Sequence, residues 1–258
     1  MILVSAVAAG DPAPDECRIL SSLDEAVDVL ASTSGDSILV CSREAAARPS
    51  LVAREVLARA DVALVTVAGS PTQQALVLRG LCRLPPSAYG LAQSVADAVR
   101  AQCRTRAAMS SVTRLSQARP SLMQHVRSFF PGASFDVDLV DGDVHSVSPI
   151  EWNVQDAGDI CWAACPDLEG LPVSLVGGQP TVVLPPAADS PYGARRWAEV
   201  STVEDLQLAV SRALTAVRAI SCGACGRTVP IAGCPFCGTW IRPPAPAVTT
   251  PTVERRLP

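Results

Sequence analysis

Residues 62–83 read VALVTVAGSPTQQALVLRGLCR, an apolar run followed at once by a helix-forming segment. The run over 62–68 is long enough for one buried strand. Ser70 is a favourable helix N-cap, and Pro71 suits the first helical position because its fixed φ is helical and no N–H is needed there. The stretch therefore predicts a strand followed by a helix over 72–83 that packs on the sheet holding the strand.

The sequence before this unit shows the same alternation. Apolar runs over 2–7 and 37–41 predict two more buried strands. Between them, Ser22-Leu-Asp-Glu25 is a capping box that opens a helix, and residues 43–60 are helical in character. The resulting β-α-β-α-β order predicts an α/β fold, in which residues 1–108 form a small parallel sheet flanked by helices.

The pattern changes near residue 109. Before it, Tyr89–Arg106 predicts one more amphipathic helix. Beyond it, apolar and polar residues alternate on both sides of Asp141-Gly142, a pair typical of a two-residue hairpin turn. Gly177-Gly178 is expected to join the strands over 172–176 and 181–184 into a second hairpin. These signals predict an α+β middle domain with antiparallel hairpins.

The last part of this middle region predicts a helix over 203–220, opened by a second capping box, Ser201-Thr-Val-Glu204. The preceding Arg195-Arg196-Trp197 is either an exposed partner anchor or a loop whose Trp covers the sheet. The expected organisation has four parts. They are an α/β domain over 1–108, an α+β domain over 109–220, a zinc ribbon over 221–241 and a Pro-rich tail over 242–258.

Four cysteines near the end of the chain form its most specific motif. Cys222 and Cys225 make one Cys-x-x-Cys pair, and Cys234 and Cys237 make another after eight intervening residues. Two such pairs on a short hairpin place four thiolates around one tetrahedral Zn²⁺. Four sulfurs leave no open coordination position, so we expect a structural zinc, with iron as the alternative metal.

The segment Cys222–Cys237, with Gly226 and Gly238 directly after the two pairs, resembles the zinc-ribbon family over about residues 220–241. Glycine suits the tight knuckle turn, where backbone N–H groups point at sulfur. The resemblance implies a module that binds proteins or nucleic acids. The alternative is that zinc simply replaces a hydrophobic core in a segment too small to have one.

A weaker set of candidates lies at the carboxyl ends of the predicted parallel strands, where open α/β sheets bind ligands. The side chains available there are Asp11, Ser42, Arg43 and Ser70. The segment over 69–72 begins a helix and could hold an anion on free backbone amides. The alternative is that these residues are ordinary caps and turns.

Composition narrows the possible functions. The net charge of −4 disfavours a general nucleic-acid binder, and the ribbon carries only Arg227, with Arg242 just beyond. All 21 basic residues are Arg, which excludes lysine Schiff-base chemistry. A GC-rich genome, as in actinobacteria or their phages, explains this bias; selection against lysine modification is the alternative. No apolar run approaches the ~20 residues of a membrane span, so we expect a cytoplasmic protein without a membrane partner.

No catalytic constellation stands out, and the two histidines, His125 and His145, cannot be placed together. The expected function is therefore a non-enzymatic interaction or assembly component, whose zinc ribbon docks to protein partners. One alternative is a nucleotide- or anion-binding enzyme or sensor that uses the strand-end loops. The other is a nucleic-acid-associated regulator that acts through the ribbon.

Overall fold

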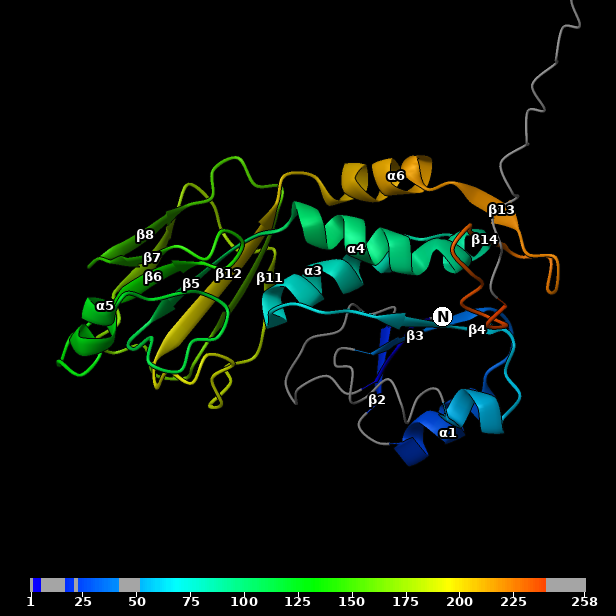
Figure 1. Ribbon diagram of the computed structural model, residues 1–258, viewed down its shortest axis with the longest axis horizontal. Coiled ribbons are helices and arrows are strands. Elements are labelled where there is room, and N and C mark those ends of the chain that lie inside the picture. The colour runs from blue at the N-terminus through cyan, green and yellow to red at the C-terminus, as the bar shows by residue number, and fades with distance from the viewer. Residues whose placement is uncertain (1, 6–16, 21–22, 42–51, 240–258) are drawn as a thin grey trace, which may run out of the picture.

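The alternation of apolar strands and helices in the first part of the chain builds a parallel sheet (Figure 1). The computed structural model describes residues 2–5, 17–20, 23–41 and 52–239. The strands lie in the order β2 (Cys17–Leu20), β1 (Ile2–Ser5), β3 (Ser37–Cys41) and β4 (Val62–Thr66). Each neighbouring pair is parallel, and the expected α/β class is confirmed.

Helices cover both faces of this sheet because side chains alternate between the two faces of a strand. Leu39 of β3 faces α1 (Leu23–Ser32), while its neighbours Ile38 and Val40 belong to the larger core that also contains α3 (Pro71–Leu81). β3 is buried along its whole length, as a strand covered on both faces must be.

The helix expected over 89–106 is wrong in its extent. The chain instead forms the 3-10 helix η1 (Pro86–Leu91), then α4 (Ala92–Gln102), and then enters β5 (Arg104–Met109). Residues of β5 pair with a strand almost a hundred positions later, and this long-range pairing overrides the local helical pattern.

A second sheet of six strands follows. Its order is β11 (Val182–Val183), β9 (Asp159–Ala164), β12 (Trp197–Val203), β5, β6 (Phe135–Asp138) and β7 (Val144–Ser146). The pairings are antiparallel apart from β11 with β9. A separate pair joins β8 (Ile150–Asn153) to β10 (Val173–Val176) in parallel.

The two expected hairpins have different outcomes. The hairpin around Asp141-Gly142 is confirmed, and Gly142 has a φ of 80°. Its turn is wider than two residues, because the Asp138 carboxylate accepts the amides of Val140 and Asp141. The hairpin at Gly177-Gly178 is wrong, since β10 and β11 pair with earlier strands rather than with each other.

Helix α6 (Leu206–Ala216) begins later than the second capping box predicts. Asp205 is the N-cap, and its carboxylate accepts the Leu208 amide at 2.8 Å. Ser201 belongs to β12, and its hydroxyl contacts the buried hydroxyl of Thr105 at 2.7 Å. Ser201 therefore stabilises the sheet core and does not cap the helix.

The remaining elements are short: α5 (Leu122–Arg127), β13 (Ala219–Ser221) and β14 (Thr228–Pro230). Figure 1 shows α3 and α4 over the first sheet and α6 on the far side of α4, with α5 at one end of the long axis and β13–β14 near the other. Trp197 is buried as the first residue of β12, so it is neither an exposed partner anchor nor a loop residue that covers the sheet. Among the residues that the structure describes, no helix combines the length and apolar character that a bilayer span requires.

Candidate metal centre

The four cysteines lie on two turns of the same construction. In the first turn, the Gly226 amide donates to the Cys222 carbonyl at 2.8 Å. In the second, the Gly238 amide donates to the Cys234 carbonyl at 3.0 Å. The two glycines have φ of 74° and 69°, a left-handed conformation that glycine adopts without steric cost. The prediction that glycine serves both tight turns is confirmed.

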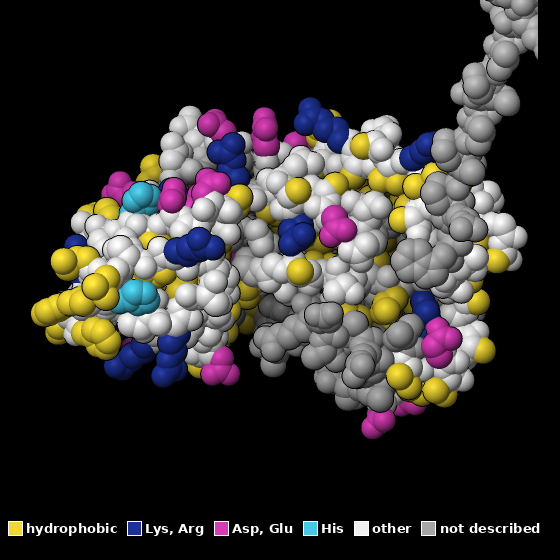
Figure 2. Space-filling view, in the orientation of Figure 1, with side chains coloured by type: hydrophobic (Ala, Val, Ile, Leu, Met, Phe, Trp, Pro, Cys, Tyr) yellow, Lys and Arg dark blue, Asp and Glu magenta, His cyan; other side chains and the backbone are white. Residues whose placement is uncertain are grey.

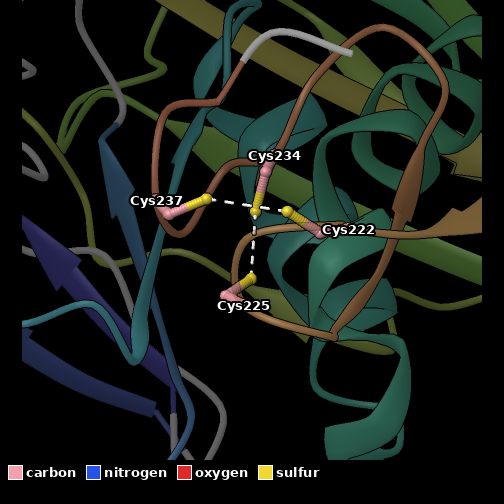
Figure 3. Close-up of side chains that lie close together, drawn as sticks. All are labelled: Cys222, Cys225, Cys234 and Cys237. Carbon is pink, nitrogen blue, oxygen red and sulfur yellow. Dashed lines mark hydrogen bonds between the residues drawn. The ribbon is translucent and has the colours of Figure 1, made fainter.

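These turns point all four sulfur atoms toward one another (Figure 3). The sulfurs lie within 4.8 Å of one another. The distance is 3.7 Å between Cys222 and Cys237 and 3.6 Å between Cys225 and Cys234. A Zn²⁺ ion with Zn–S bonds of ~2.3 Å needs sulfurs about 3.8 Å apart. The donor set and its spacing therefore fit one tetrahedral zinc.

The surroundings of the four sulfurs shift the pKa values of the thiols in different directions. The Thr239 hydroxyl, 3.1 Å from the sulfur, and the Thr239 amide lower the pKa of Cys237 to about 6. Burial acts to raise the pKa of Cys225, but hydrogen bonds from the Arg227 amide and neighbouring thiols lower it overall. Burial raises the pKa of Cys234 to about 12. A bound cation would offset that burial, because a metal favours the deprotonated thiol.

The cysteine segment is packed into the protein body and does not project from it. Cys222 and Cys234 are only 1% and 4% exposed and belong to the main core. The Arg54 guanidinium donates to the Pro235 carbonyl at 2.9 Å, which ties the second turn to the N-terminal half. The backbones of η1 and β14 are also in close contact, since a Cβ added at Gly90 would lie 2.1 Å from the Thr228 carbonyl.

The arginine expected to contact nucleic acids is used inside the molecule. Arg227 forms an ion pair with Asp36 at 2.7 Å, and its guanidinium stacks over Phe236 at 4.5 Å. Its pKa is raised, chiefly by hydrogen bonding to the Asp36 carboxylate. Arg242 lies outside the described residues. Arg227 is thus paired and stacked within the protein, and it gives no support to the nucleic-acid alternative.

The strand-end candidates can be followed only in part. Asp11, Ser42 and Arg43 lie outside the described residues, and Ser70 precedes α3 as its N-cap. The next amide of that helix, from Thr72, donates to the Glu199 carboxylate at 2.9 Å. This part of the helix N-terminus is therefore occupied by a carboxyl group from the protein itself.

Glu199 is the centre of a buried polar network that the sequence does not reveal. The side chain is fully buried, and it accepts the hydroxyls of Thr72 and Tyr192. The Thr72 hydroxyl also contacts Ser201 at 2.6 Å. Burial raises the pKa of Glu199, although hydrogen bonds from neighbouring hydroxyls act in the opposite direction. The network joins the start of α3 to the middle of β12.

Comparison with known proteins identifies no family from sequence. No family model matches the chain, and no curated protein matches it. Among solved structures, a DegV family protein from Corynebacterium glutamicum has 10% identity and a TM-score of 0.48, covering 79% of this chain and 96% of that one. Another, from Eubacterium eligens and loaded with heptadecanoic acid, has 10% identity and a TM-score of 0.45, covering 71% and 78%.

The expected resemblance to zinc ribbons is corrected, because no family model of that kind matches the chain. The similar structures are DegV family proteins matched over most of the chain, and no zinc-ribbon family is indicated. The function built on that resemblance, docking to partners through a ribbon, is wrong together with its two alternatives. The physical reason is visible in the packing: one side of the cysteine segment is packed against Asp36, Arg54 and η1, so the segment is part of the protein body and not a separate module.

Proposed function

We propose that the protein binds one structural Zn²⁺ through the thiolates of Cys222, Cys225, Cys234 and Cys237. The observation that carries this proposal is the mutual distance of the sulfurs, which fits the edges of a zinc–thiolate tetrahedron. A four-sulfur site leaves the metal no position for substrate, so its contribution is to folding.

The metal has a defined structural task. Residues 231–239 contain no helix or strand, and their own hydrogen bonds close only turns. Zinc would cross-link this segment to Cys222, directly after β13. Through Arg54 and Arg227 the same segment contacts the N-terminal half. The ion would therefore fasten the C-terminal strands against the first sheet and its helices.

The test is metal analysis of the purified full chain. We expect one zinc per chain, and none after Cys225→Ser with Cys234→Ser, because two remaining thiols cannot complete the tetrahedron. Cys82→Ser is the matched control, since this partly buried thiol lies outside the cluster, and its zinc content should be unchanged.

Cobalt provides an independent readout. Replacing zinc by Co²⁺ should give the visible absorption of a tetrahedral thiolate site in the wild type and in Cys82→Ser only. Iron in place of zinc would show as a coloured protein with iron in the metal analysis. A wild-type chain that binds no metal in reductant with added zinc, or a double variant that keeps its zinc, would refute the proposal.

A further inference from the structure

The end of the molecule that carries α5 exposes an unusual amount of apolar surface. Large apolar side chains on α5 and the turn after it are open to solvent. They are Leu122 (81% exposed), Met123 (75%), Val126 (46%), Phe129 (81%) and Phe130 (63%), which we call the apolar tip. Figure 2 shows a hydrophobic cluster protruding at the same end as α5 in Figure 1. This surface is convex, unlike the concave grooves that receive peptides.

Two polar side chains of this segment, Gln124 and Ser128, face the protein instead of the solvent. The Gln124 amide donates to the Val144 carbonyl of β7 at 2.6 Å. The Ser128 hydroxyl accepts the Val112 amide at 3.1 Å. A surface helix normally buries its apolar face and exposes its polar one. In α5 the apolar side chains face the solvent instead. Its hydrogen bonds hold the apolar tip outward.

The segment that carries the apolar tip is itself basic, while the neighbouring β6–β7 turn, which lies beside Gln117 and Ala118, exposes Asp141 and Asp143. Residues 110–134 contain Arg114, Arg119 and Arg127 but no Asp or Glu, within a chain of net charge −4. The three arginines are exposed. Within the described part of the chain, the ion pairs involve other arginines. Their charge is therefore available to an anionic partner.

We infer that the apolar tip inserts into the interface of a lipid membrane with anionic headgroups. A convex apolar segment flanked by arginines suits that surface, because acyl chains accept the apolar side chains and the headgroups attract the arginines. A protein groove would need polar atoms placed to pair with those around the tip. A bilayer needs only an apolar layer deep enough for the side chains and anionic headgroups for the arginines. This is attachment to the surface and not a span, and it revises the expectation of no membrane partner.

The experiment is flotation of the full chain with vesicles of phosphatidylcholine alone or mixed equally with phosphatidylglycerol. The wild type should float with the mixed vesicles, and less with phosphatidylcholine. Phe129→Ser with Phe130→Ser should lower the partition coefficient at least about tenfold, because two exposed aromatic side chains are lost. Arg119→Gln with Arg127→Gln should abolish the preference for the anionic vesicles and the weakening by salt.

A control removes two exposed apolar side chains elsewhere: Val56→Ser with Leu208→Ser should leave flotation unchanged. Circular dichroism verifies that each variant folds. Absent binding to both vesicle types would overturn the inference, as would equal binding by the Phe129/Phe130 variant. Self-association of the wild type through these phenylalanines, measured by analytical ultracentrifugation without vesicle binding, would assign the tip to a second copy of this chain and would also overturn it.

Discussion

At the scale of single residues, predictability depends on how far away the interacting partners lie in the sequence. The roles of Gly226 and Gly238 are fixed by cysteines within a few positions, so the sequence predicts them. Glu199 is buried against Thr72, 127 positions earlier in the chain, and a charged residue in a strand normally suggests a solvated face. Only the apolar neighbours of Glu199 along β12 could have indicated its burial.

Burial of Glu199 predicts a pH effect on stability. Its pKa is raised above 4.5 in the folded protein, so above about pH 4.5 the unfolded chain releases a proton that the folded protein retains. Stability contributed by the protonated form is therefore lost as pH rises through the folded pKa. Glu199→Gln should remove this loss, so the variant gains on the wild type by up to about 1.4 kcal/mol per pH unit in that window.

Urea denaturation at several pH values between 4.5 and 8 measures this difference. Glu151→Gln, at an exposed position on β8, is the control and should follow the wild type throughout. A Glu199→Gln variant that loses stability relative to the wild type as pH rises would show that the folded protein holds this carboxyl in its charged form.

At the scale of elements, the sequence predicts most helices and strands but misplaces several boundaries. Helix α3 follows from Ser70 and Pro71 because capping is local. Helix α6 starts later than expected because Ser201 belongs to β12, where its hydroxyl contacts the buried hydroxyls of Thr72 and Thr105. The strands β10 and β11 have partners outside the local hairpin, and no turn signal reveals those.

The contact between η1 and β14 can be tested by a substitution that adds one methyl group. A Cβ at Gly90 of η1 would meet the Thr228 carbonyl at 2.1 Å, and this carbonyl belongs to a paired strand that cannot easily retreat. We expect Gly90→Ala to lower the free energy of unfolding by about 2 kcal/mol or more. Gly223→Ala is the control, because nothing lies within 4 Å of its added Cβ. Equal stability of the two variants in urea would contradict this packing.

At the scale of the whole molecule, the sequence predicts the α/β class but not how its parts share a core. Buried residues of the first sheet, the second sheet and the cysteine segment belong to one cluster, including Ile38, Phe135 and Cys222. The sequence suggests a self-contained ribbon because the cysteine spacing is local. Its packing against Asp36, Arg54 and η1 depends on contacts that the spacing does not encode.

This shared core predicts that metal removal affects the whole protein. If zinc fastens the cysteine segment, chelation should lower the melting temperature of the main transition by at least about 5 °C, because binding to the folded state alone stabilises that state. Differential scanning calorimetry with and without a chelator measures the shift. The Cys225→Ser and Cys234→Ser double variant should melt at the lower temperature in both conditions, whereas an unchanged wild-type transition would exclude a structural role for the metal.

The connection of β5 and β12 has a consequence for how the chain can vary. Arg104 and Thr202 are paired neighbours, so the segment between them begins and ends at the same place in the second sheet. Packing of α4 on α6 lies just outside this point, on the side of the first sheet. Loops between Arg104 and Thr202 can therefore lengthen or shorten without changing the path from α4 to α6. The apolar tip lies on the connection between β5 and β6, so its sequence can change independently of the metal centre.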